Sequence, residues 1–239
     1  PDADSLGMYG RAFDVNGTLA DNLDEITKEI FIHNNIIVGA LIGFRTKSGY
    51  DPTSETYNKV HNNTFINCKR VVELISPNHD DTTTCGNGVD FRGNIVENST
   101  VDNIYSDNHS DSYLFIICDN NIWHSSSTPV WTLDGVECDD YADWKSDFNS
   151  FFGYDADANS LTGDPLLVGA GTYDEDTDVK FPTNSPAKDN GADLTPTDYF
   201  GTSRPQGEGD DIGAFELPVE GSPEDTYTIG VSLTGTGCR

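Results

Sequence analysis

Six side chains within or at the ends of β-prone segments have the chemistry to bind an acidic sugar polymer. Arginine binds carboxylates through paired hydrogen bonds, so Arg45 and Arg70 could meet a uronate, with Glu73 as a third catalytic candidate. Aromatic rings offer flat apolar faces on which sugars can stack. The candidates for substrate binding are Tyr105, Trp131 and Asp134. An ordinary exposed β surface carries the same residue types, and this alternative stays open.

The acidic run "DEDTD" contains the candidate metal ligands Asp174, Asp176 and Asp178. Carboxylate oxygens are the ligands that Ca²⁺ prefers, so Ca²⁺ is the cofactor that this run would bind. Closely spaced acidic residues also occur as a solvated charge run, and the sequence supports both interpretations.

A motif built around asparagine recurs along the first two thirds of the chain. Its copies occupy residues 30–39, 59–68, 90–99 and 116–125, with a weaker fifth at 145–154. The anchoring asparagines are Asn35, Asn63, Asn94, Asn121 and Asn149. Successive asparagines are 28, 31, 27 and 28 residues apart. This period, with β-formers and no helical periodicity, predicts an all-β solenoid of the parallel β-helix kind.

The repeated asparagines are expected to form a ladder at a corner between two strands. Asparagine tolerates left-handed backbone conformations and can hydrogen-bond within its own turn. Stacked copies would lie about 4.8 Å apart, so the side-chain amides could bond from one copy to the next. A second strand of each copy is expected at 40–45, 70–75, 101–106 and 129–134. These strands carry the sugar-binding candidates, so any active surface should lie on the sheet that they form.

The chain is strongly acidic, with 41 acidic and 13 basic residues among 239 and a formal net charge of −28. Such a surface repels nucleic acid and anionic membranes, which argues against both as partners. No apolar stretch is long enough to span a membrane. The length suits one large β domain, and the acidity is typical of a secreted or salt-adapted protein.

The five cysteines show no CxxC spacing, which argues against a zinc ribbon. Cys118 lies in an apolar run and is expected in the core. Cys85 and Cys138 lie in polar segments and could form a disulfide. The odd number of cysteines leaves at least one thiol unpaired, and Cys238 near the end of the chain is the expected one.

The asparagine pattern fades after about residue 155, where the chain becomes rich in Gly, Pro and Asp. We expect residues 1–217 to form the β-helix, with its last coils and a cap after residue 155. Such a cap would cover the open end of the solenoid and protect its strand edges. Residues 218–239 read as a linker and one strand, the start of a further module if the natural chain is longer.

Four short motifs in this last segment carry a resemblance to a known family. They are "DPL" at 164–166, "NSPAKDNGA" at 184–192, "GTSRP" at 201–205 and "DIGAFE" at 211–216. The series resembles the closing section of secreted bacterial and archaeal right-handed parallel β-helix proteins, the pectate-lyase-like proteins of the choice-of-anchor Q type. Lys188 and Asn190 depart from the usual pattern. The resemblance implies a right-handed parallel β-helix that lies outside the cell or at the cell surface.

The same resemblance implies a carbohydrate-associated protein that binds or processes an acidic polysaccharide or cell-surface glycan. Lyases of this fold use a basic side chain to remove a proton beside a uronate carboxylate, and a cation to neutralise that carboxylate. No catalytic motif of the family matches this chain residue by residue. The alternative function is therefore a non-catalytic adhesin or structural scaffold, part of a larger anchored protein.

Overall fold

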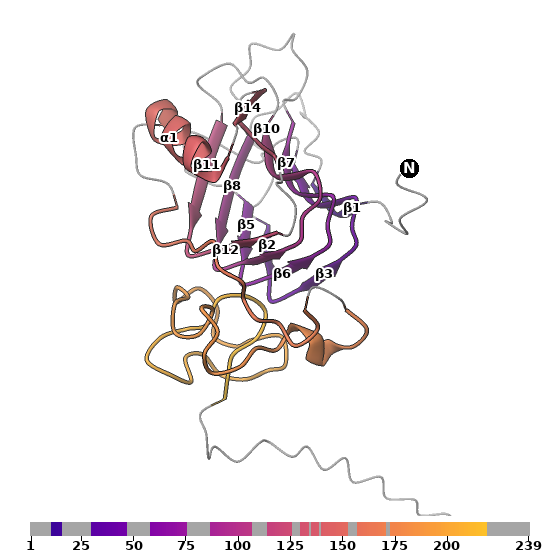
Figure 1. Cartoon of the computed structure of the whole chain (residues 1–239), viewed down its shortest axis with the longest axis vertical. Helices are drawn as coiled ribbons and strands as arrows, with labels where there is room; N and C mark the ends of the chain where they lie inside the picture. Colours follow the sequence, from indigo (N-terminus) through magenta and orange to yellow (C-terminus); the bar gives the residue numbers. More distant parts are fainter. Residues whose placement is uncertain are drawn as a thin grey trace, which may run out of the picture.

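Short parallel strands predominate in the computed structural model of the chain (Figure 1). The structure describes residues 11–15, 30–46, 58–75, 87–106, 114–125, 130–133, 135–138, 140–152, 157–170 and 173–218. These stretches contain one α-helix and one short 3-10 helix. The prediction of a chain that is mostly β, with parallel sheets, is confirmed.

The strands form three sheets, here called sheets I, II and III. Sheet II contains β2 (Phe31–His33), β5 (Asn58–His61), β8 (Asn87–Arg92) and β11 (Leu114–Asp119). Sheet III contains β3 (Ile36–Val38), β6 (Thr64–Ile66), β9 (Ile95–Glu97) and β12 (Ile122–His124). Sheet I contains β1 (Arg11–Val15), β4 (Ile42–Thr46), β7 (Arg70–Leu74), β10 (Asp102–Ser106), β13 (Val130–Leu133) and the antiparallel β14 (Val136–Cys138). The chain visits sheets II, III and I in turn and then repeats this order.

Equivalent positions of successive strands lie in register, which stacks similar side chains in one apolar core. Sheet III contributes the column Ile37, Phe65, Val96 and Trp123, and sheet I contributes Phe44, Val72 and Ile104. All of these side chains are buried in the same cluster. Burying a side chain of this size contributes about 1.5–3 kcal/mol, so these columns are a main reason why the repeats stack.

Four asparagines form a hydrogen-bonded ladder between sheets II and III. The backbone N–H and side-chain amide of Asn35 donate to Oδ1 of Asn63, at 2.9 and 3.0 Å. Asn63 donates in the same way to Asn94, at 2.9 and 3.1 Å. Asn94 donates to Asn121, at 2.9 and 3.2 Å. The amides of the two central rungs, Asn63 and Asn94, also donate to backbone carbonyls of the preceding repeat and of their own corner.

The left-handed residue at this corner is the one before each ladder asparagine. Asn34, Asn62, Gly93 and Asn120 have φ angles of 54°, 52°, 69° and 52°. Only glycine and asparagine fill this column, because they adopt the left-handed conformation at low cost. The expectation that the ladder asparagines themselves adopt the left-handed conformation was wrong by one residue. Their side chains instead form hydrogen bonds between successive repeats.

The fifth asparagine, Asn149, is not a rung of the ladder, because it lies in helix α1 (Tyr141–Phe152). The carboxylate of Asp140 accepts the backbone N–H groups of Ala142 and Asp143 at 2.8 and 2.9 Å, which starts the helix. Trp144 and Phe148, one turn apart, are buried in the main core. Residues 145–152 of the segment predicted as a weak fifth strand repeat therefore belong to an amphipathic helix that packs on β13 and β14.

The ladder ends instead at residues 157–161. The backbone N–H of Asn121 donates to Ser160 Oγ at 2.7 Å, and Leu161 forms a parallel bridge with Ile122. The buried carboxyl of Asp157 accepts the Trp123 indole N–H at 2.8 Å and the Tyr141 hydroxyl at 2.7 Å. Hydroxyl and carboxyl oxygens thus replace the amide that a further asparagine would supply.

The C-terminal segment, residues 157–218, pairs with the last repeat at Leu161 and then covers the outer face of sheet III (Figure 1). Ile66, Ile95 and Ile122 of sheet III pack there against apolar residues of the segment, which include Leu167, Phe181, Ile212 and Phe215. The backbone N–H of Gly213 donates to the carbonyl of Gly93 at 2.7 Å. Gly213 has a φ angle of 95°, and a side chain there would lie 2.6 Å from Ile95, so both the backbone and the contact favour glycine. Most side chains on both faces of sheet III are apolar, so its second face must be covered.

A buried ion pair joins two of the motifs in this segment. The guanidinium of Arg204 donates to Glu216 Oε2 at 3.0 Å and to the carbonyls of Asp211 and Gly213 at 2.6 Å. The backbone N–H of Gln206 donates to Glu216 Oε1 at 2.7 Å. The side chains of Arg204 and Glu216 are 0% and 1% exposed. The arginine of "GTSRP" and the glutamate of "DIGAFE" therefore hold the segment together from inside.

This ion pair predicts a pH dependence of stability. Burial raises the pKa of Glu216 from 4.5 to about 7, so between these values the folded chain holds a proton that the unfolded chain has lost. Stability from this group is therefore full below pH 4.5, falls as the pH rises towards 7, and is level above that. We expect urea unfolding to give a lower free energy of unfolding at pH 8 than at pH 5. The decrease should be smaller in Glu216→Gln, and an equal decrease in both proteins would contradict the assignment.

Candidate functional site

Sheet I brings together four of the six predicted sugar-binding residues. Arg45, Glu73 and Tyr105 are in register on β4, β7 and β10. Arg45 Nε lies 3.1 Å from Glu73 Oε2, and the guanidinium of Arg70 lies 2.5 Å from Glu73 Oε1. Arg70 also places its guanidinium carbon 4.1 Å from the centre of the Tyr105 ring.

A fifth member of this cluster, Asp102, was not among the predicted residues. Its Oδ2 lies 2.5 Å from Nε of Arg70, with which it is in register. Asp102 begins a repeat strand at the position that Arg70 occupies in the preceding repeat, so an alignment of the repeats could have found it. The cluster therefore contains two arginines and two carboxylates, and its formal charges balance.

The balanced charges leave the cluster poorly suited to removing a proton from a substrate. Burial lowers the pKa of Arg70, but its hydrogen bonds with Asp102 and Glu73 outweigh burial and raise that pKa above its ordinary value. Burial raises the pKa of Asp102 against the effect of Arg70. An arginine base must lose its proton, and here two carboxylates stabilise the charged form.

Trp131 is not available to stack on a sugar, contrary to the prediction. Its side chain is only 3% exposed and belongs to the apolar core. Its ring centre lies 4.7 Å from that of Trp123, 5.3 Å from Tyr141 and 4.6 Å from Trp144. Helix α1 supplies two of these rings. Because the sequence analysis did not predict this helix, it placed the Trp131 side chain on an exposed surface and not in the core. Asp134 lies outside the described residues.

The three predicted calcium ligands do not converge on one point. Asp178 Oδ2 accepts the backbone N–H groups of Asp174 and Glu175 at 2.6 and 3.0 Å, at the start of the 3-10 helix η3 (Asp176–Val179). These bonds lower the pKa of Asp178. Asp176 accepts the hydroxyls of Tyr173 and Tyr199. Two of the three carboxylates are therefore used to build and anchor a turn.

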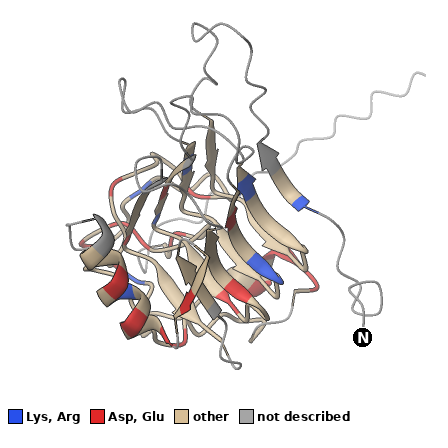
Figure 2. Cartoon of the chain, turned by 90° about the horizontal axis from the view of Figure 1, so that it is seen from above, with Lys and Arg blue, Asp and Glu red and all other residues tan. Residues whose placement is uncertain are grey.

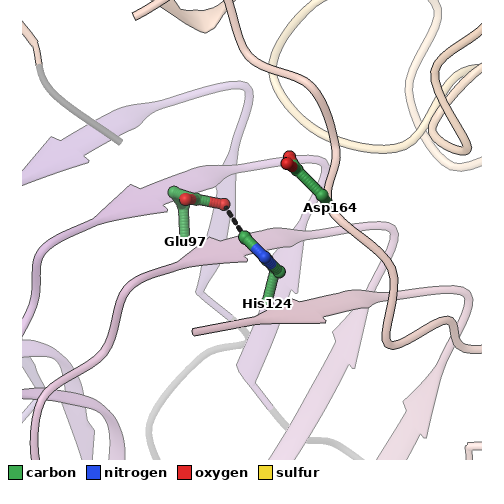
Figure 3. A group of neighbouring side chains, drawn as sticks. All are labelled: Glu97, His124 and Asp164. Carbon is green, nitrogen blue, oxygen red and sulfur yellow. Dashed lines mark hydrogen bonds and ion pairs between the residues drawn. The ribbon is translucent and has the colours of Figure 1, made fainter. Parts of the chain in front are cut away.

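Among the described residues, the side chains that do bring metal-ligating atoms together are those of Glu97, His124 and Asp164 (Figure 3). One ligand atom from each lies within 4.8 Å of the other two. Nδ1 of His124 lies 2.8 Å from Oε2 of Glu97, and the two residues are in register on β9 and β12. Asp164 comes from the C-terminal segment, within its "DPL" motif.

Glu97 and His124 continue a column of sheet III that begins with the apolar residues Val38 and Ile66. The Glu97 side chain is only 5% exposed. Burial raises its pKa, the hydrogen bond with His124 opposes this, and the charge of Asp164 adds to the rise. Both residues lie three positions after a ladder asparagine, a signal that the sequence prediction did not use.

The predicted disulfide between Cys85 and Cys138 is not formed, because Cys138 is a buried thiol. Cys68 and Cys118 are also buried thiols, as expected for Cys118. Cys138 Sγ lies 3.8 Å from Oδ2 of Asp147 on α1, so this thiol contributes to packing of the helix. Cys85 and Cys238 lie outside the described residues.

Acidic residues occur in α1 as well as in strands and turns (Figure 2). None of the described helices has the length and apolar character needed to cross a membrane.

Comparison with protein families, curated proteins and solved structures gave no significant match. The resemblance of residues 164–216 to choice-of-anchor Q proteins therefore stays a prediction from the sequence motifs.

Proposed function

We propose that this chain is a right-handed parallel β-helix that acts as a non-catalytic scaffold or adhesive module at the cell surface or outside the cell. The recurrent strand order through sheets II, III and I supports the β-helix. The four C-terminal motifs and the net charge of −28 support the extracellular setting.

The observation that carries the non-catalytic function is the charge pairing on sheet I. The arginines that were catalytic candidates are both held by Glu73, and Arg70 is held by Asp102 as well. The aromatic candidate Trp131 is buried. A polysaccharide lyase needs an uncompensated base and a free cation or charge for the uronate, and the described part of sheet I offers neither.

Incubation with alginate, pectate and chondroitin tests this proposal. We expect no rise in the absorbance of unsaturated products with any polymer, in the presence of Ca²⁺ or Zn²⁺. An established pectate lyase serves as the positive control. A rise that is lost in Glu73→Gln would overturn the scaffold function and place a lyase site on sheet I.

A second candidate function, binding of a glycan without cleavage, is favoured by the pairing of Arg70 with Tyr105. The Arg70 side chain is 30% exposed and its guanidinium lies over the ring of Tyr105, which is itself partly exposed. Affinity electrophoresis in gels that contain each polymer distinguishes the two functions. Retardation that weakens in Tyr105→Ala would support glycan binding, and unchanged mobility would support a scaffold alone.

A further inference from the structure

We propose that Glu97, His124 and Asp164 form a binding site for a divalent transition-metal cation, of which Zn²⁺ fits best. The three residues come from β9, β12 and the C-terminal segment, so a bound ion would join sheet III to the segment that covers it (Figure 3). Such a site goes beyond a scaffold function, because it makes the closure of the fold dependent on a metal.

The ligand set points to Zn²⁺ and not to the Ca²⁺ expected from the sequence. Imidazole nitrogen and carboxylate oxygen are both ligands that zinc accepts, and zinc takes four ligands in total. Ca²⁺ prefers six to eight oxygen ligands and has little affinity for imidazole. With three protein ligands, a zinc ion would have one position left for water.

The burial of Glu97 gives a separate reason for a cation at this place. Its carboxyl follows the apolar residues Val38 and Ile66 in a column of sheet III, beside the C-terminal segment that supplies Asp164. Burying a carboxylate costs free energy unless it is paired. Its two oxygens contact His124 Nδ1 at 2.8 Å and the Asn98 amide at 3.0 Å, while the carboxylate of Asp164 faces the same point. A divalent ion would neutralise both carboxylates at once.

The geometry requires only small side-chain movements to admit the ion. Nδ1 of His124 and Oε2 of Glu97 are 2.8 Å apart, a hydrogen-bond distance. Two such atoms on one tetrahedral zinc ion would be about 3.4 Å apart, so the metal would replace the shared proton. Asp164 is fixed from the other side, because its Oδ1 accepts the backbone N–H of Leu166 at 2.7 Å.

Calorimetric titration of the chelator-treated full chain with ZnCl₂ tests the site. We expect one zinc ion to bind per chain, and zinc at 100 times its dissociation constant to raise the melting temperature by about 5 to 10 °C. CaCl₂ at the same concentration should give a clearly smaller rise. Equal rises with both ions would overturn the proposal, because they would indicate unspecific binding to the acidic surface.

Two variants and a matched control locate the ion. Asp164→Asn removes the charge of an exposed side chain but keeps an oxygen acceptor for Leu166, so it should fold and lose at least tenfold in zinc affinity. His124→Gln should lose more, whereas His33→Gln, which changes an exposed histidine of β2, should bind zinc as before. X-ray absorption of the zinc-loaded chain should show nitrogen and oxygen ligands that include imidazole. Unchanged affinity in both site variants, or a zinc shell without imidazole, would overturn the proposal.

Discussion

Replacing Arg204 with alanine is expected to lower the free energy of unfolding by about 3–5 kcal/mol, the largest effect that we predict for a single side chain. Arg204 is completely buried and donates hydrogen bonds to Glu216 and to the carbonyls of Asp211 and Gly213. Its removal leaves the Glu216 carboxylate and two carbonyls without their partner in a site that water does not reach. The penalty comes mainly from this uncompensated charge.

Urea unfolding at pH 8, followed by circular dichroism, measures the effect, because Glu216 is then largely ionised. Lys188→Ala is the matched control, since Lys188 pairs with Asp189 at 2.9 Å but its side chain is 38% exposed. An exposed pair contributes about 0–1 kcal/mol, so the control should unfold nearly as the parent does. Similar losses in the two variants would show that the Arg204 pair is not stabilising the fold.

Replacing Asn94 with alanine is expected to cost about 2–4 kcal/mol, because several buried hydrogen bonds are lost at once. Oδ1 of Asn94 accepts the backbone and side-chain amides of Asn63, and its own amide donates to Val60, Arg92 and Asn121. The side chain is fully buried, so water cannot replace these partners.

The ladder also predicts that replacing a rung at its end lowers the free energy of unfolding less than replacing a rung at its centre. Asn35 is partly exposed and bonds to one neighbouring rung, so Asn35→Ala should cost about 1 kcal/mol. The same urea unfolding compares the two variants. Equal effects of Asn35→Ala and Asn94→Ala would contradict a ladder whose central rungs are satisfied from both sides.

The repeating features of the fold were within reach of sequence reasoning, because they depend on residue types at a nearly constant spacing. The ladder asparagines and the strands of sheet I recur every 27 to 32 residues in the first four repeats. The fifth repeat was misread because residues 145–154 contain an asparagine among apolar residues and so imitate the motif. The spacing of four between Trp144 and Phe148, after the cap at Asp140, is the helical signal that decides the matter.

The role of the C-terminal segment could not be read from its own composition, since Gly, Pro and Asp show no periodicity. The signal lay instead in sheet III, where consecutive residues such as Phe65 and Ile66, or Ile95 and Val96, are both apolar. Such pairs indicate a strand that is buried on both faces.

The candidate metal centre likewise contains two ligands that could be predicted from the sequence and one that could not. Glu97 and His124 occupy equivalent repeat positions and could have been paired from the sequence. Asp164 reaches them only because the C-terminal segment folds back on sheet III, which no local pattern encodes.

The cover on sheet III also sets an order of events during synthesis and folding. The strand repeats pair with segments about 30 residues away and can assemble while the chain is still emerging from the ribosome. The contacts of the cover span 150 residues between Thr64 and Ala214 and 163 between Asn34 and Thr197. Closing such long loops is slow, so the cover docks last. Until Phe215 has been synthesised, the isoleucines of sheet III form an uncovered apolar surface on the nascent chain. The chain is therefore most prone to aggregate at this stage.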